Sequence, residues 1–478
     1  MLLFDAATLV VLFLYCVTQL SDRLAQWRLP VFLLLAMILV CHLLTDGLRW
    51  QLVPMYTALL LAAVCQVAPL HRGWAKGLSI FALSIAPLSA IASWAFPMFE
   101  IPEPSGQYAV GTTKFVVVDT DRSDVFASIP GPRRLTLRAW YPTEQSDKRR
   151  TPYWREANLR SEKTLESTPL PGFTFTHLGK VPTHSVWDAE PLANERYPVV
   201  IYSHGIGLGW ASGNTALVED IASHGYVVIA IGHSGIGSAT IFDAEKDDLA
   251  LFDPATAEAM AIPPGDEVLA LRDQMLASGD WHEQVELYAK GMELMDPRPL
   301  AAVTQALNVM VDDQQFVMTN LSEWPELARL SIDSERIGLI GMSLGGCAVV
   351  MNCADNEACD AGVNLDGFHP DQIDVGAVAP MLFMNTGGVL FSQTNFRATD
   401  QPAYSVTIPE VTHFNFFDFT IMSPLYKIMG VLGEIDGERM VDITRGYSVS
   451  FYDRHLKGQV TSFDLGFDEV EFQSANLD

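Results

Sequence analysis

A serine lies between glycines directly after an apolar run in residues 336–350, RIGLIGMSLGGCAVV. Residues 341–345 fit the pattern G-x-S-x-G, after a predicted strand and before a predicted helix that begins near Leu344. In that context the glycines allow a strained strand-to-helix turn, which exposes the hydroxyl and places the next backbone N–H at a helix N-terminus. We predict that Ser343 is a nucleophile; the alternative is a small residue in a tight turn. Ser234, in GHSGIG, does not fit the spacing and is interpreted as a loop residue.

A serine hydroxyl reacts near neutral pH only when a base takes its proton, and that base needs a carboxylate to orient it. Folds built around this turn use the chain order serine, acid, histidine. Three of the eleven histidines follow the first plausible acid, namely His369, His413 and His455. The predicted base is His413, in the loop VTHFNFFD after the predicted strand YSVTIPE, with a packed loop histidine as the alternative. His369 is three residues from Asp366 on the same loop, and His455 lies in SFYDRHLKG, which has the pattern of a terminal surface helix.

The predicted acid is Asp366, at the end of the predicted strand AGVNLD. In many hydrolases the acid follows the next strand, but here that strand ends in MNTGG, which has no carboxylate. Asp366 is therefore chosen largely by elimination, with Asp360 as the nearest rival. Judged alone, Asp366 could be an exposed aspartate in a turn.

Two backbone N–H groups are predicted to hold the negative charge that develops on a carbonyl oxygen under attack. Leu344 supplies one, directly after the serine. The second is expected from the loop YSHGIGLG, where Gly205 and Gly207 let the backbone approach a ligand, and the Ile206 N–H is the candidate. His204 in this loop is interpreted as a structural side chain, and a role unrelated to catalysis stays open.

Short apolar runs that alternate with helical stretches must position these residues. The predicted strands are KFVVVDT, RLTLRAWYP, YPVVIYSHG, GYVVIAIGH, RIGLIGMS, AGVNLDG, APMLFMN and YSVTIPE. Several are apolar on both faces, and predicted helices at 216–224 and 344–352 lie between them, which is typical of a mostly parallel α/β sheet covered on both sides. The first two strands are predicted to be antiparallel, because no long helix separates them. A helical stretch at about 243–335 interrupts the strands, as an inserted cap or lid would.

Four apolar runs precede this domain, at 6–20, 29–44, 52–70 and 77–96. A helix of about 20 residues crosses the hydrocarbon core of a bilayer, and these runs lack the polar face of soluble helices. We predict four membrane spans rather than a buried bundle in a soluble protein. The first run is not a signal peptide, because Asp5 stands where a basic segment belongs. Lys and Arg favour the first and third loops by one charge each, so the positive-inside rule places both termini and the large domain on the outer side, periplasmic or extracellular.

The chain is predicted to divide into a membrane region at 1–97, a proline-rich linker at 98–112 and an α/β domain at 113–478. Of 30 Lys/Arg and 57 Asp/Glu, the membrane region holds five and three, so the remainder is strongly acidic. An acidic surface repels phosphate backbones, which argues against a nucleic-acid partner.

Neither Cys nor His has zinc-ligand spacing, and no metal or other cofactor is expected. Cys353 and Cys359 could pair in an exported domain, although two free thiols explain their spacing as well.

The chain resembles the platelet-activating-factor acetylhydrolase family of α/β-hydrolases over about 113–458. The motifs that carry the resemblance are YPVVIYSHGIG, DIASHGYVVIAIGHSGIGSAT, RIGLIGMSLGG, VNLDGF and THFNFFDF. The resemblance implies a calcium-independent serine esterase that acts on phospholipids with short or oxidised acyl chains. It also implies the same nucleophile, acid and base (Ser343, Asp366, His413) and the same oxyanion donors (Ile206, Leu344). An acid placed after the strand that follows the nucleophile is the family's own arrangement.

We therefore expect an α/β-hydrolase, preceded by four transmembrane helices, that cleaves lipid or phospholipid esters through a Ser-His-Asp triad and an acyl-enzyme. The expected partners are a lipid ester and the membrane. The aromatic residues of HFNFFDF could shape an acyl pocket, with core packing as the alternative. Two other functions stay open. One is a general carboxylesterase or polyester-type hydrolase, and the other is a catalytically idle domain that binds lipid or a partner.

Overall fold

The protein is described by a computed structural model of the 478-residue chain. The structure describes residues 3–127, 130–145, 148–165, 171–193, 195–368, 375–387, 390–463 and 465–477. His369, the nearby rival for the base, lies outside these described residues.

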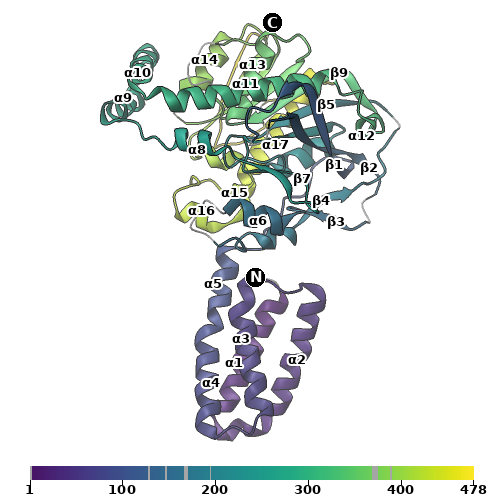
Figure 1. Ribbon diagram of the computed structural model, residues 1–478, viewed down its shortest axis with the longest axis vertical. Helices are drawn as coiled ribbons and strands as arrows, with labels where there is room; N and C mark the ends of the chain where they lie inside the picture. Colours follow the sequence, from purple (N-terminus) through teal and green to yellow (C-terminus); the bar gives the residue numbers. More distant parts are fainter. Residues whose placement is uncertain are drawn as a thin grey trace.

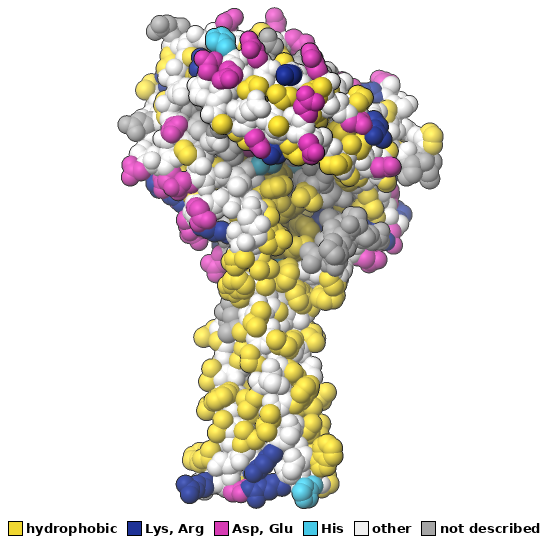
Figure 2. Space-filling model, turned by 90° about the vertical axis from the view of Figure 1, so that its left-hand side faces the viewer, with side chains coloured by type: hydrophobic (Ala, Val, Ile, Leu, Met, Phe, Trp, Pro, Cys, Tyr) yellow, Lys and Arg dark blue, Asp and Glu magenta, His cyan; other side chains and the backbone are white. Residues whose placement is uncertain are grey.

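The N-terminal region is a bundle of long apolar helices that projects from one end of the α/β domain (Figure 1). Its members are α1 (Leu3–Leu20), α2 (Arg28–Thr45), α3 (Val53–Val67), α4 (Arg72–Ile85) and α5 (Pro87–Ala95). Pro87 is the first residue of α5, where its missing N–H costs nothing, so α4 and α5 together form one long helical segment. Among the residues that the structure describes, four helical segments are long and apolar enough to cross a membrane, at Leu3–Leu20, Asp22–Thr45, Trp50–Val67 and Arg72–Ala95. Apolar side chains cover the outside of the bundle, and Lys and Arg gather at the end away from the α/β domain (Figure 2).

A mostly parallel sheet of eleven strands organises the α/β domain, in the order β13-β12-β11-β10-β9-β5-β6-β2-β1-β4-β3. The parallel centre consists of β5 (Tyr197–Ser203), β6 (Val227–His233), β9 (Ile332–Met342), β10 (Ala361–Leu365), β11 (Met381–Thr386) and β12 (Ala403–Ile408). The edges add β1 (Ala109–Ser123), β2 (Pro132–Thr143), β3 (Arg150–Pro152), β4 (Pro182–Trp187) and β13 (Glu471–Ala475). The predicted antiparallel pairing of the first two strands is confirmed, since Ala109 pairs with Thr143 and Asp119 with Arg133.

Helices cover both faces of the sheet. Successive residues of a strand point to opposite faces, so Val200 and Tyr202 belong to the core under α7 (Thr215–Ser223) and α17 (Gly437–His455). Val199 and Ile201 belong to the opposite core, under α11 (Pro297–Thr319), α13 (Leu344–Asp355) and α14 (Leu390–Ala398). Two buried faces explain why these strands read as continuous apolar runs.

Helix α17 differs from its prediction as a surface helix, because one face packs on the sheet. Tyr452 is fully buried, and its hydroxyl donates to the Leu339 carbonyl at 2.8 Å. His455 lies 3.2 Å from the Tyr404 hydroxyl, and burial lowers the pKa of its imidazole to about 4. The segment mixes aromatic and charged residues, and only the tertiary packing decides which side is covered.

Between β6 and β9 the chain forms a small hairpin and a series of helices. These are β7 (Ala239–Asp243), β8 (Asp248–Leu251), α8 (Pro254–Met260), α9 (Asp266–Ala277), α10 (Trp281–Leu294), α11 and α12 (Pro325–Ala328). Asp253, Asp280 and Asp296 cap the N-termini of α8, α10 and α11 by accepting backbone N–H groups. The α9–α10 pair projects from the domain, while α11 returns across the sheet (Figure 1).

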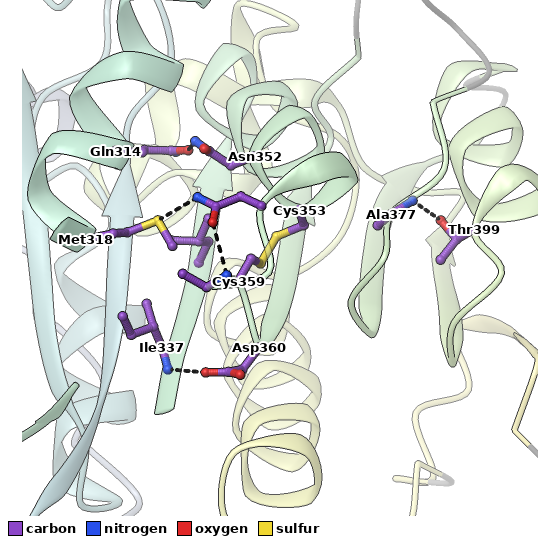
Figure 3. The surroundings of a disulfide bond; sticks show 12 residues. Gln314, Met318, Ile337, Asn352, Cys353, Cys359, Asp360, Ala377 and Thr399 are labelled. Atoms are coloured by element: carbon purple, nitrogen blue, oxygen red, sulfur yellow. Dashed lines mark hydrogen bonds between the residues drawn. A yellow bond between two sulfur atoms is a disulfide. The ribbon is translucent and has the colours of Figure 1, made fainter. Parts of the chain in front are cut away.

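A disulfide joins Cys353, near the end of α13, to Cys359, just before β10 (Figure 3). The structure therefore favours pairing over two free thiols. Directly beside it, the Asp360 carboxylate accepts the Ile337 N–H at 2.7 Å (Figure 3). Asp360 precedes β10 whereas Asp366 follows it, so the two candidate acids lie at opposite ends of one strand.

Candidate active site

Ser343 occupies a strained turn between β9 and α13. Its backbone has φ 58° and ψ −126°, a conformation that side-chain-bearing residues rarely adopt. The flanking glycines are required by close packing. A Cβ on Gly341 would lie 2.2 Å from the Gly345 carbonyl, and a Cβ on Gly345 would lie 2.2 Å from the Ser203 carbonyl oxygen. The geometry is that of a nucleophile elbow, with the serine held at the carboxyl end of the sheet.

Asp366 lies beside the serine because neighbouring strands end together. Met342 and Leu365 are partners in the β9–β10 ladder, and the Ser343 N–H donates to the Leu365 carbonyl at 2.9 Å. Asp366 itself has φ 53°, and its N–H donates to the Met384 carbonyl on β11 at 2.8 Å. The carboxyl group is 5% exposed, so it is nearly sealed from solvent.

His413 and Asp366 are hydrogen-bonded, with 2.7 Å between Nδ1 and Oδ2. The second carboxylate oxygen accepts the Thr386 N–H at 3.0 Å. His413 begins the short helix η4 (His413–Phe416), in which Thr412 and Asn415 cap each other reciprocally. This capping fixes the loop that carries the imidazole. The histidine side chain is 35% exposed and can meet a ligand.

The structure joins the predicted acid to the predicted base, but it shows no hydrogen bond on the Ser343 hydroxyl among the described residues. Catalytic hydrogen bonds without substrate are often long and tighten only in the complex. Ser343 and His413 are nevertheless tied to adjacent positions, since one bonds Leu365 through its N–H and the other bonds the next residue, Asp366.

The predicted oxyanion donors come from two elements. Leu344 is the first residue of α13, and the first N–H groups of a helix have no partner within it. The Ile206 N–H likewise makes no hydrogen bond to the described residues. Its loop packs against Ser343, the predicted nucleophile, because a Cβ on Gly205 would lie 3.0 Å from the Ser343 Cβ.

His204 holds this loop from inside the protein. Its Nε2 accepts the His233 N–H at 3.2 Å, so Nδ1 carries the proton and donates to the Gly205 carbonyl at 2.8 Å. Burial, with a contribution from nearby His233, lowers the pKa of the His204 imidazole to about 3, so the ring stays neutral. In a trans peptide the carbonyl and the next N–H point in opposite directions. Holding the Gly205 carbonyl inward therefore turns the Ile206 N–H away from His204.

A buried polar network behind this loop was missed in the sequence. Its centre is Asp313 on α11, whose carboxylate binds His233 Nδ1 at 2.9 Å and Arg133 Nη2 at 2.7 Å. Ser203 Oγ lies 3.0 Å from His233 Nε2, so the group has the connectivity of a serine triad. All of its members are at most 1% exposed, which excludes contact with a substrate. The signal in the sequence was a pair of adjacent acids, Asp312 and Asp313, inside the helical stretch VMVDDQQF.

Asp418 belongs to the loop that carries His413, and its hydrogen bonds hold that loop in place. It is fully buried, and its Oδ2 accepts the Tyr153 hydroxyl at 2.9 Å and the Thr215 N–H at 2.6 Å at the start of α7. Burial raises the pKa of the Asp418 carboxyl to about 7 despite these hydrogen bonds. The loop after His413 is thus tied to a group that changes charge near neutral pH.

An apolar pocket of about 540 Å³ adjoins the acid. It lies among α9, α10 and α11, and its wall includes Asp366 and Phe368. The apolar lining is Val268, Leu269, Leu271, Met275, Leu276, Leu287, Met292, Met295, Leu300 and Val303. Pockets of this size and character commonly hold small apolar ligands. The aromatic residues Phe416 and Phe417, which the sequence suggested for an acyl pocket, are instead buried in the core.

The remaining rival residues are engaged elsewhere. Ser234 Oγ donates to Asp124 and accepts from Arg133, so it is a structural loop residue as expected.

Within the described part of the chain, Asp5, His42 and Asp46 form a cluster of metal-ligand type in the helical bundle. Arg49 pairs with Asp5, so ion pairing accounts for that cluster.

Comparisons with known proteins identify the family and the fold. The model of the family described as platelet-activating factor acetylhydrolase, isoform II, matches residues 94–477. The platelet-activating factor acetylhydrolase of Canis lupus familiaris is 27% identical, over 84% of this chain and 86% of its own length. That of Bos taurus is also 27% identical, over 79% and 82%. A solved ferulic acid esterase from Streptomyces cinnamoneus superposes with a TM-score of 0.58 at 24% identity, covering 78% of this chain and 99% of the esterase, a likeness of fold.

Proposed function

The chain belongs to the platelet-activating factor acetylhydrolase, isoform II, family and is an ester hydrolase, and we propose that it cleaves lipid esters with Ser343, His413 and Asp366. One observation carries the assignment of these residues. The 2.7 Å hydrogen bond between His413 and Asp366 lies beside the strained turn that presents Ser343. A nucleophile, a base and an orienting acid at one sheet edge are the requirements of acyl transfer through a serine.

In the proposed reaction His413 Nε2 takes the Ser343 proton while Oγ attacks the ester carbonyl carbon. Because Nδ1 donates to Asp366, Nε2 carries the lone pair that accepts the proton. The carboxylate stabilises the imidazolium that forms. The imidazolium then protonates the leaving alcohol, and the acyl group stays on Ser343. Water, deprotonated by the same histidine, attacks the acyl-enzyme and releases the acid.

The Leu344 and Ile206 N–H groups are proposed to hold the oxyanion of both tetrahedral intermediates. Loss of one such donor lowers turnover by about 10² to 10³. A backbone donor cannot be removed by side-chain substitution, but its direction can be changed. Substitution of His204, which removes the hydrogen bond to the Gly205 carbonyl, is therefore the way to change the direction of the Ile206 N–H.

The proposed substrate is a lipid or phospholipid ester with a short or oxidised acyl chain, as the family implies. The apolar pocket beside Asp366 supports a hydrocarbon chain as part of that substrate. Burial of each methylene contributes about 0.8 kcal/mol, so a pocket of this kind distinguishes lipid esters from small soluble ones.

The helical bundle is proposed to anchor the enzyme, with the α/β domain on the outer side of the membrane. Arg23, Arg28, Arg72 and Lys76 belong to the connection between α1 and α2, to the start of α2 and to the start of α4. Lys and Arg gather at the bundle end away from that domain (Figure 2), which is the cytoplasmic end by the positive-inside rule. The Cys353–Cys359 disulfide supports an oxidising compartment. We also propose the division into residues 1–97, 98–112 and 113–478 with an insertion at about 243–335. Anchoring raises the local concentration of a lipid substrate without any new contact.

The test is turnover of short-chain and long-chain phospholipid esters by the full-length protein and by Ser343→Ala, together with labelling by a fluorophosphonate. We expect labelling and phospholipid turnover in the wild type and neither in the variant. Turnover of soluble esters without phospholipids would indicate a general carboxylesterase. Absence of labelling in folded wild-type protein would indicate an idle binding module and refute the proposal.

A further inference from the structure

Another cavity, of about 40 Å³, lies between β1, β2, α6 (Ala157–Leu165) and β7. Its lining includes three cations that are largely withdrawn from solvent, Lys114, Arg138 and Arg160, and one carboxylate, Glu156. The whole chain carries a net charge of −27, so such a gathering of positive charge is unexpected. Neither the ester hydrolysis nor the polar network behind the nucleophile uses these residues.

Arg138 is the most deeply buried of these cations, at 8% exposure. Its Nε donates to the Thr112 hydroxyl at 3.2 Å, and the guanidinium lies 4.6 Å from the centre of the Trp140 ring. Its Nη2 has no hydrogen-bond partner among the described residues. The indole Nε1 of Trp154, on the wall of the same cavity, also lacks an acceptor there. Two residues that line one cavity therefore each carry a buried donor that needs an acceptor.

The nearby carboxylates already have hydrogen-bond partners other than Arg138 and Arg160. Glu156 accepts from Lys114 Nζ at 3.0 Å. Glu219 accepts backbone N–H groups of β4 with both of its oxygens, at 3.0 and 2.9 Å. Arg160 donates to a backbone carbonyl of β7 at 2.8 Å. Burial lowers the pKa of Arg138 to about 10 and also lowers that of Arg160, as expected for cations that lack a hydrogen-bonded carboxylate.

We propose that this cavity binds a small oxyanion of the phosphate class. Water would accept from Arg138 and Trp154 but would add no negative charge, whereas an oxyanion supplies both. Guanidinium groups match the planar oxygen pairs of phosphate. Each water-sized site needs roughly 10–15 Å³, so the cavity has room for the oxygens of one phosphate group, and any organic part attached to that phosphate must lie outside it.

The phosphate group can come from solution or from a lipid headgroup. Helix α6 lies at the end of the domain next to the helical bundle (Figure 1). The two regions are in contact there, because Trp50 Nε1 donates to the Thr174 carbonyl at 3.1 Å. A headgroup is therefore within the reach of this side of the domain if the bundle lies in a bilayer. The inference is independent of the proposed catalytic residues.

The test is isothermal titration calorimetry of the full-length protein in phospholipid-free detergent. The titrants are inorganic phosphate, the soluble phosphodiester glycerophosphocholine, and chloride at matched ionic strength. The variants are Arg138→Met and Arg160→Gln. The matched control is Arg134→Gln, because Arg134 is on the same strand but is only half-buried and pairs with Asp248 outside the cavity. Circular dichroism establishes whether each variant is folded. If Arg138→Met does not fold, the comparison with the wild type is made with Arg160→Gln.

We expect saturable binding of phosphate in the wild type and in Arg134→Gln, and a loss of about tenfold or more in affinity in the cavity variants, as for a hydrogen bond to a charged group. Binding of inorganic phosphate alone would assign the site to a free anion, and binding of glycerophosphocholine as well would assign it to a headgroup. Responses to phosphate and the phosphodiester no larger than the response to chloride, or cavity variants that bind like the wild type, would overturn the proposal.

Discussion

Replacement of Asp366 by asparagine tests the assignment of the acid most sharply, because the structure dictates how the amide would sit. Oδ1 of Asp366 accepts the Thr386 N–H at 3.0 Å, so the amide oxygen must stay on that side. The amide nitrogen would then face His413 Nδ1, which is 2.7 Å from Oδ2 in the wild type. A donor at that position forces Nδ1 to accept, and the imidazole proton moves to Nε2.

A histidine protonated on Nε2 cannot take the Ser343 proton. The loss expected from such a tautomer change is about 10⁴ in kcat. KM should change little, because Asp366 does not hold the scissile ester. The assay is steady-state hydrolysis of a soluble short-chain ester, together with the rate of fluorophosphonate labelling, which requires the same proton transfer.

Asp360→Asn is the matched control. It makes the same chemical change at the other end of β10, where the carboxylate only accepts the Ile337 N–H. We expect it to retain the turnover of the wild type. The assignment of the acid is wrong if Asp366→Asn stays within about twofold of the wild type, or if both substitutions cost the same.

Three further predictions concern stability, cross-linking and substrate choice. The pKa of Asp418 is raised from 3.8 to about 7, so the folded protein holds this proton more tightly than the unfolded chain. The stability that this proton contributes is therefore fully present below about pH 4 and is lost as the pH rises through about 7. The melting temperature should fall across this pH range, and the fall should be smaller in Asp418→Asn. Replacing both Cys353 and Cys359 by serine opens a loop of six residues' separation and should lower the free energy of unfolding by about 2 kcal/mol, measured by urea titration, while reductant should leave that variant unchanged. Met292→Glu places a carboxylate in the apolar pocket and should lower kcat/KM for long-chain esters by about tenfold or more, while short-chain esters are unaffected; equal losses for both would speak against a chain in this pocket.

Most of the fold and the core of the candidate site could be predicted from local patterns. Continuous apolar runs identified the central strands, and G-x-S-x-G after such a run identified the turn at Ser343. The order serine, acid, histidine then narrowed the partners to Asp366 and His413. These predictions work because the pleat of a strand, the period of a helix and the strain of a turn depend on neighbours in the chain.

Other features could not be found in this way, because they join segments far apart in the chain. Asp313 meets His233 and Arg133 only when α11 crosses the sheet next to β6. The apolar pocket forms only when the α9–α10 pair lies beside Phe368. Helix α17 carries a mixed pattern that suggested the surface, and the sheet decided its buried face.

The sequence by itself determined the local features of this protein: a serine in a strand-turn-helix segment of the G-x-S-x-G type, an α/β sheet, and apolar helices ahead of it. The tertiary structure decided that Asp366 and His413 are hydrogen-bonded, that buried His204 holds the Gly205 carbonyl, and where an apolar pocket and a small polar cavity form. The physical reason is the distance along the chain over which each kind of interaction acts. Secondary structure follows from interactions over a few residues, whereas a site exists only after the order of the strands has brought distant side chains within hydrogen-bonding distance.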